Sequence, residues 1–239
     1  VTFTGRTVSG REIAKTAGSR LVPALLELGG KSPNIVFDDA NLDDAVAGAI
    51  YGIYSNAGQS CIAGSRIFVH EAIYDAFVKR LAEAAKALVV GDPYDPATAV
   101  APVSSFAHRD RIERMITQSR EEGARVLAGG GRPATAAHDK GAFIAPTLLE
   151  LDSNSMSIAQ EEIFGPVACL LRFKDDEDLI AQANDTVFGL ACGIWTSDYR
   201  RALRASRAIK AGTVWINTYK MTAVNMPFGG FKSSGIGRE

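Results

Sequence analysis

Residues 34–42 read Asn-Ile-Val-Phe-Asp-Asp-Ala-Asn-Leu, and this stretch predicts a strand, a turn and the start of a helix. Residues 34–37 have the length of a short buried strand, and residues 38–41 offer turn and helix-capping side chains. From Leu42 onward, apolar residues recur at helical spacing, as Val46, Ala49, Ile50 and Ile53. The stretch therefore predicts one strand-to-helix unit.

The same alternation extends in both directions along the chain. Upstream, residues 1–4 predict a strand that leads through Gly5 into a helix ending at Gly18, and an apolar run follows at 21–28. Downstream, we expect strands at 66–70, 125–128, 167–173, 190–196 and 213–217, and helices at 71–88, around 112–119, at 176–184 and at 199–209. Residues 132–141 are expected to form a solvent loop, and residues 227–238 show no regular period. Strands that alternate with helices of this length predict an α/β fold with a largely parallel sheet flanked by helices.

Composition and charge exclude several classes of protein. The chain has 239 residues, 46% of them hydrophobic, and its 26 Lys and Arg nearly balance 27 Asp and Glu. This balance is typical of a globular domain and argues against nucleic acid as the main partner. No stretch approaches the roughly 18 apolar residues that span a bilayer, and no signal peptide is visible, so we expect no membrane partner.

The cysteines and histidines do not form a metal-ligand pattern. Cys61, Cys169 and Cys192 lack a Cys-x-x-Cys pair, which argues against a disulfide scaffold or a structural zinc site and favours a reducing, cytoplasmic compartment. The histidines lie far apart and are expected at the surface or at helix ends: His70, His108 and His138. We therefore predict no metal site.

Cys61 lies in a small polar loop, whereas Cys169 and Cys192 lie in apolar segments typical of core cysteines. A thiolate attacks carbonyl carbon well, and we expect the N–H groups of the loop around Cys61 to lower its pKa. A buried, inert cysteine is the alternative reading of Cys61.

Glu27 interrupts the apolar run at 21–28. Burial of a carboxylate without a partner is costly and raises its pKa, which suits a general base. A solvent-facing position on a half-buried strand is the alternative.

Considered together, these two segments resemble the active-site signatures of the aldehyde dehydrogenase superfamily. The segments are Leu-Glu-Leu-Gly-Gly-Lys-Ser-Pro at 26–33 and Gly-Gln-Ser-Cys at 58–61, with Glu27 and Cys61 separated by 34 positions. Further segments resemble the family in the same order along the chain: Phe-Thr-Gly at 3–5, Glu-Glu-Ile-Phe-Gly-Pro at 161–166, Gly-Thr-Val-Trp-Ile-Asn at 212–217, and 227–235. The resemblance therefore covers essentially the whole chain.

The resemblance implies an activity and assigns roles to residues. Cys61 would attack an aldehyde, hydride transfer to NAD or NADP would leave a thioester, and Glu27 would activate the water that hydrolyses it. The implied cofactor-binding residues are Gly5, Arg6, Leu28, Glu162, which would hold the nicotinamide ribose, and Phe164, which would pack near the nicotinamide ring. Asn217 and Tyr219 are candidates for lining the aldehyde funnel. Arg6 departs from the small Ser of many members, and it would either block or pair with a cofactor phosphate.

The resemblance also implies a domain organisation. Residues 1–28 would be the last piece of a Rossmann-like cofactor domain, residues 29–233 the catalytic domain and residues 234–239 a tail. Family members are roughly twice as long and commonly homo-oligomeric. We therefore expect the chain alone to be a weak dehydrogenase, because hydride transfer needs a positioned acceptor.

Two alternative functions stay open at the level of sequence. One is a CoA-acylating semialdehyde dehydrogenase, although members of that type commonly lack the base that Glu27 would supply. The other is a non-catalytic domain that retains the fold. In each enzymatic reading the partner is a small-molecule aldehyde.

Overall fold

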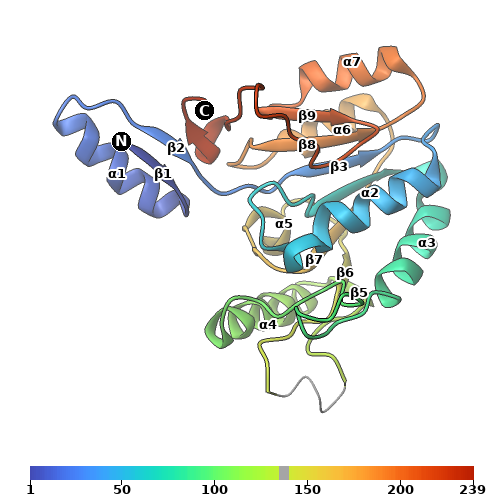
Figure 1. The fold of residues 1–239 in the computed structure, drawn as a ribbon. Coiled ribbons are helices and arrows are strands. Elements are labelled where there is room, and N and C mark those ends of the chain that lie inside the picture. Colours follow the sequence, from blue (N-terminus) through green and yellow to red (C-terminus); the bar gives the residue numbers. More distant parts are fainter. Residues whose placement is uncertain (135–139) are drawn as a thin grey trace.

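The computed structural model describes residues 1–134 and 140–239, in which two β-sheets organise the chain (Figure 1). The strands are β1 Thr2–Thr4, β2 Leu25–Glu27, β3 Pro33–Val36, β4 Arg66–His70, β5 Arg125–Ala128, β6 Thr147–Glu150, β7 Val167–Phe173, β8 Ala191–Trp195, β9 Thr213–Ile216 and β10 Gly235–Ile236. The helices are α1 Thr7–Ser19, α2 Leu42–Tyr54, α3 Tyr74–Lys86, α4 Phe106–Glu121, α5 Ser157–Gln160, α6 Asp176–Asn184 and α7 Tyr199–Ala208, with 3-10 turns η1 Ser55–Gly58, η2 Glu71–Ile73 and η4 Lys232–Ser234. Among the described residues, no helix is both long and apolar enough to cross a bilayer.

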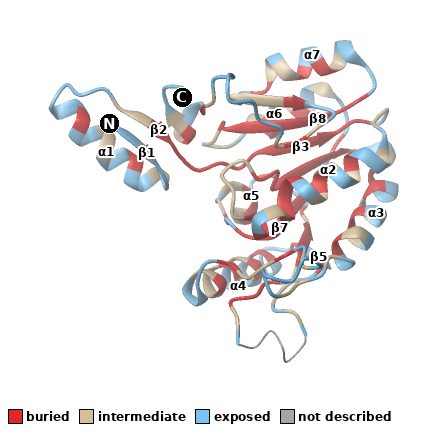
Figure 2. Cartoon of the chain, viewed as in Figure 1, coloured by how far each residue is buried: buried red, intermediate tan, exposed pale blue. Residues whose placement is uncertain are grey.

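The larger sheet has seven strands in the order β5-β6-β7-β4-β3-β8-β9. Its pairs are parallel except for β5 with β6. The central strands β3 and β8 are buried along their whole length, and Figure 2 shows this buried centre in red. Strands that are buried on both faces require helices on both sides of the sheet, which explains their continuous apolar sequences.

The smaller sheet has three strands, with β2 between β1 and β10. β1 runs parallel to β2 and β10 antiparallel to it. Figure 1 shows α1 and β1 standing to one side of the large sheet, with the C-terminus close to β2. Because β2 ends at Glu27 and β3 begins at Pro33, the chain passes from the small sheet to the large one through Leu28–Ser32.

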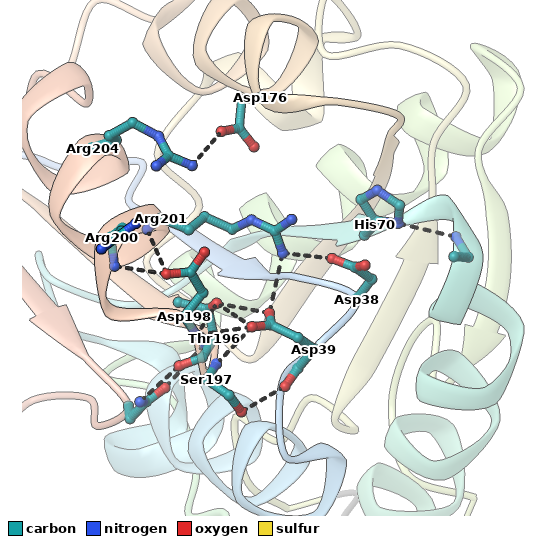
Figure 3. A network of polar contacts seen from close by, with 12 residues as sticks. Asp38, Asp39, His70, Asp176, Thr196, Ser197, Asp198, Arg200, Arg201 and Arg204 are labelled. Atoms are coloured by element: carbon teal, nitrogen blue, oxygen red, sulfur yellow. Dashed lines mark hydrogen bonds and ion pairs between the residues drawn. The ribbon is translucent and has the colours of Figure 1, made fainter.

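A polar network anchors the beginning of α7 to the end of β3 (Figure 3). The Asp39 carboxylate accepts hydrogen bonds from the Thr196 hydroxyl at 2.7 Å and from the backbone N–H groups of Ser197 and Asp198 at 3.0 and 2.9 Å. Arg201 contributes an ion pair to Asp39 at 3.2 Å. The network fixes the turn between β8 and α7.

The structure confirms the predicted α/β class and most predicted elements. The strands at 66–70, 125–128 and 167–173 and the helix at 176–184 coincide with β4, β5, β7 and α6. Cys169 and Cys192 are buried in β7 and β8, as expected.

Three features differ from the sequence prediction. The helix expected at 71–88 begins as the 3-10 turn η2 and continues as α3. Elements β6 and α5, of four residues each, were not predicted from the sequence. The segment 227–238, expected to be irregular, contains η4 and β10, which forms through pairing with β2 rather than through local preference. Part of the loop predicted at 132–141, including His138, lies outside the described residues.

Candidate active site

Glu27 ends the central strand of the small sheet. Its backbone pairs with Thr4 on one side and Gly235 on the other, and its carbonyl oxygen accepts the N–H of Gly5 at 3.0 Å. The residue is only 4% exposed, and within the described part of the chain neither carboxylate oxygen has a hydrogen-bond partner. The pKa of Glu27 is raised to about 7, mainly by burial and then by the Glu239 charge, against the opposing Arg238 charge. Glu27 is therefore a carboxyl that exchanges a proton near neutral pH.

Cys61 follows a sharply reversed segment after α2. Asn56, Ala57 and Gly58 all adopt left-handed backbone conformations, with φ of 54°, 51° and 70°. A Cβ atom at Gly58 would collide with the carbonyl of Gly165, so only glycine lets this loop pack against the loop that carries Glu162. The reversal ends α2 and presents Cys61 at the junction of two loops.

The pKa of the Cys61 thiol is raised, mainly by burial and then by the charge of Glu162. The backbone N–H groups of Cys61 and Ile62 lower it, and the Glu27 charge raises it again. The loop N–H groups therefore lower the pKa of this thiol, as expected, but desolvation and two nearby carboxylates outweigh them, so the net pKa is raised. The thiol needs a base before it can act as a nucleophile.

Gly29 and Gly30 carry the chain between Glu162 and Cys61. The Gly30 N–H donates to Glu162 Oε1 at 3.0 Å. A Cβ atom at Gly30 would collide with the carbonyl oxygen of Cys61, and one at Gly29 would meet the Glu162 carboxylate. The glycine pair therefore allows Glu27, Cys61 and Glu162 to converge.

These residues line a cavity of about 980 Å³. Its walls contain every site residue in the main predicted set, namely Gly5, Arg6, Glu27, Leu28, Cys61, Glu162 and Phe164. The small sheet and α1 supply one wall, and the Cys61 and Glu162 loops supply the other. The structure thus brings together residues that lie up to 159 positions apart in sequence.

The predicted cofactor residues differ in their surroundings. Arg6 is exposed at the N-cap position of α1, and its side chain makes no capping bond. Leu28 is buried against Gly10 of α1, where a Cβ atom would collide with it. Phe164 is 40% exposed and has a left-handed backbone with φ 58°. Arg6 and Phe164 therefore face the cavity, whereas Leu28 packs α1 against the end of β2.

Two residues of α4 hold the Glu162 loop and were missed at the sequence level. Arg111 donates to the carbonyl oxygens of Ile163 and Glu162, both at 2.9 Å. His108 Nε2 lies 2.7 Å from the carbonyl oxygen of Phe164. Their i, i+3 spacing places both on one helix face, but nothing in the sequence says which loop that face meets.

Asn217 and Tyr219 do not line the cavity around Cys61. Asn217 exchanges hydrogen bonds at 3.0 Å with the backbone of Thr196. Tyr219 is 3% exposed, and its hydroxyl donates to the carbonyl oxygen of Ile62 at 3.1 Å. Glycine residues give its ring space, at Gly52, Gly64 and Gly193. Tyr219 therefore holds the Cys61 loop through Ile62 without lining the cavity.

Comparison with known proteins identifies the family. A model of the aldehyde dehydrogenase family matches residues 1–239. The chain is 48% identical over 239 residues to betaine aldehyde dehydrogenase of Brucella melitensis biotype 2 (strain ATCC 23457), covering 100% of this chain and 49% of the relative.

Solved structures agree with this match. The crystal structure of a putative aldehyde dehydrogenase from Burkholderia cenocepacia superimposes with a TM-score of 0.98 at 46% identity, covering 100% of this chain and 49% of the other. PnpE in complex with nicotinamide adenine dinucleotide gives a TM-score of 0.97 at 45% identity, covering 100% of this chain and 49% of PnpE. The chain thus spans about half the length of these relatives. It belongs to the aldehyde dehydrogenase family.

Proposed function

We propose that this chain carries the catalytic residues of an NAD-dependent aldehyde dehydrogenase, which converts an aldehyde into a carboxylic acid. The observation that carries the proposal is the convergence of Cys61, an unpartnered buried Glu27 and Glu162 in one cavity. The family membership and the NAD complex of PnpE support the same reading.

In the first step, the Cys61 thiol loses its proton and the sulfur adds to the aldehyde carbon, which gives a thiohemiacetal. Glu27 is suited to take that proton, because its pKa lies near 7. The backbone N–H groups of Cys61 and Ile62, which stabilise negative charge on the sulfur, are suited to stabilise the oxyanion as well.

When bound, NAD would supply the hydride acceptor that converts the thiohemiacetal on Cys61 into a thioester. Glu27 releases the thiol proton to solvent and then removes a proton from water, which attacks the thioester carbon; the acid leaves as the Cys61 sulfur takes this second proton from Glu27.

The residues that line the cavity fit a dinucleotide. The N-terminus of the 13-residue helix α1 opens on the cavity beside the cationic Arg6, a combination that favours pyrophosphate. Glu162 uses one oxygen for the Gly30 N–H, and its carboxylate is suited to accept ribose hydroxyls. The exposed ring of Phe164 offers an apolar surface for nicotinamide. We propose that these residues hold the cofactor, and that Arg6 pairs with phosphate rather than blocking it.

Formation of NADH in the presence of aldehydes tests the proposal. The protein that carries this chain is expected to reduce NAD with at least one aldehyde from a panel of charged and neutral compounds, and to release a free acid. The Cys61→Ala variant is the matched control and is expected to form no NADH. The absence of NADH with every aldehyde, in a folded protein that still binds NAD, would contradict the proposed reaction.

A further inference from the structure

Lys220 lies on the side of the Cys61 loop that is formed by α2 and the segment after β9. Its Nζ donates to the Ser55 hydroxyl at 2.8 Å and lies 5.9 Å from the centre of the Tyr51 ring. Ser55 is the first residue of η1, the turn that leads into the Cys61 loop. The Lys220 backbone is left-handed, with φ 59°, which is uncommon for a lysine. This conformation directs the long side chain back toward the end of α2.

The Lys220 ammonium is partly buried and pairs with no carboxylate among residues 1–134 and 140–239. Burial lowers the pKa of Lys220 to about 8, and the negative charge of the Cys61 thiolate raises it. The group is therefore mostly charged at neutral pH. The residue before it, Tyr219, donates a hydrogen bond to the carbonyl oxygen of Ile62, which places this segment against the Cys61 loop. In the described part of the chain, its polar contacts are a neutral hydroxyl and an aromatic ring, and no carboxylate forms an ion pair with it.

An unpaired cation beside a nucleophile has a direct chemical consequence. An ammonium group has three N–H donors, and the Ser55 hydroxyl uses one of them. The remaining donors and the charge attract an anionic group and repel a cationic one. Arg6 and Arg111 are also cations of the site, but they line the cavity proposed to hold the cofactor, whereas Lys220 is not part of its lining.

We propose that Lys220 is a specificity-determining residue that favours aldehydes carrying a carboxylate and disfavours aldehydes carrying a quaternary ammonium group. The inference rests on the proposed role of Cys61 as the nucleophile. It separates this chain in substrate class from its relatives named betaine aldehyde dehydrogenase, because betaine aldehyde is a cation.

Alkylation of Cys61 tests the charge preference without cofactor or turnover. Iodoacetate and iodoacetamide both lose iodide when the Cys61 sulfur attacks, but only iodoacetate is an anion. The ratio of their rates at Cys61, followed by peptide mapping, cancels the fraction of thiolate. Lys220→Met is expected to lower the iodoacetate-to-iodoacetamide ratio about tenfold at low salt, and Lys220→Arg is expected to retain it.

Lys79→Met is the matched control, because it removes the same charge from an exposed position on α3. It is expected to leave the ratio unchanged, and the melting temperature of each variant reports its folding. An equal ratio in wild type and Lys220→Met, with both proteins folded, would overturn the inference.

Turnover provides the second readout. In the protein that carries this chain, kcat/KM for succinic semialdehyde, a four-carbon anion, is expected to fall about tenfold in Lys220→Met, while kcat/KM for neutral butyraldehyde stays within twofold. Oxidation of butyraldehyde with no effect of Lys220 on charge preference would overturn this inference and leave the proposed function standing. Absence of turnover together with a charge-dependent alkylation ratio would instead contradict the proposed function alone.

Discussion

Glu27 and Asp39 are acids near the ends of strands, but their surroundings are opposite. Asp39 is held by the Thr196 hydroxyl, two backbone N–H groups and Arg201 (Figure 3). Partial burial acts to raise the pKa of Asp39, but these hydrogen bonds and the Arg201 charge lower it more, so the net pKa lies below its ordinary value. Glu27 has no partner for either oxygen, and its pKa rises to about 7.

The difference teaches how a carboxylate becomes structural or reactive. At Asp39 the protein supplies the donors that water would supply, so the charged form is stable and the group holds two elements together. At Glu27 the protein withholds them, so the charged form is destabilised and the group readily exchanges a proton. The hydrogen-bonded carboxylate of Asp39 thus anchors α7, whereas the carboxylate of Glu27, which lacks such bonds, lies in the candidate site.

The largest expected effect is that of Cys61→Ala, which should abolish activity without changing stability. Replacing Cys61 by Ala removes the proposed nucleophile and is expected to reduce aldehyde oxidation by about 10⁴-fold or more. The melting temperature is expected to change little, because Cys61 is not a core residue. Steady-state kinetics and thermal unfolding measure the two effects. Cys192→Ala, at a buried position in β8, is the control and is expected to show the reverse pattern.

Glu27→Gln is expected to lower the oxidation rate by about 10² to 10⁴-fold, because it removes a general base while keeping the size of the side chain. The same variant is expected to be more stable than wild type at pH 8. Since the folded pKa of about 7 exceeds the ordinary value of 4.5, the folded state binds the extra proton, and wild-type stability falls as pH rises through this interval.

Thermal unfolding between pH 5 and pH 8 checks this sign. The melting temperatures of Glu27→Gln and wild type are expected to converge near pH 5 and to differ by a few degrees at pH 8. A variant that is less stable than wild type at pH 8 would mean that the Glu27 carboxylate is satisfied, and the contrast with Asp39 would be lost.

Asp39→Asn is expected to lower the free energy of unfolding, whereas Glu27→Gln is expected to raise it at pH 8. It removes the charge that pairs with Arg201 and places an amide where two backbone N–H groups need an acceptor, at a cost of about 2 kcal/mol in the free energy of unfolding. Because the folded pKa of Asp39 lies below 3.8, the wild-type advantage is present above that value and is lost as pH falls through the folded pKa. Denaturant unfolding at pH 7 and pH 3 measures the difference, and equal destabilisation at both values would contradict the role of the charge.

The smallest expected effect concerns the support behind Cys61. Tyr219→Phe removes the hydrogen bond to the Ile62 carbonyl and is expected to cost about 1 kcal/mol of stability. Alkylation of Cys61 by iodoacetamide is expected to change by less than about threefold, because the ring still fills its glycine-lined space. Tyr94→Phe, at a position 94% exposed, is the control. A variant with unchanged stability would show that the hydroxyl contributes nothing to the loop.

The sequence predicted the reactive residues better than their environment. A thiol in a polar loop and an acid in an apolar run are unusual placements, so Cys61 and Glu27 were visible as residue types. The net direction of the Cys61 pKa shift could not be predicted, because it depends in part on Glu162, which is 101 positions away in the chain. Arg111 and Lys220 were invisible for the same reason, since their partners come from other elements.

Periodic elements of the large sheet were predicted closely, because continuous apolar strands and amphipathic helices have clear patterns. The short elements β6 and β10 depend on pairing with strands placed elsewhere, which no local pattern records. The separation into two sheets was likewise hidden, since the five-residue passage from β2 to β3 contains no linker-like composition.

Because only Leu28–Ser32 joins β2 to β3, the candidate site depends on the two sheets staying packed together. Glu27 belongs to the small sheet, whereas the Cys61 loop packs on the large one, so the pair exists only while both sheets are docked. The small sheet has short strands and little buried surface of its own, and such units open at lower free energy than a central core. Warming this chain is therefore expected to separate the two sheets, and with them Glu27 and Cys61, before the seven-stranded sheet melts.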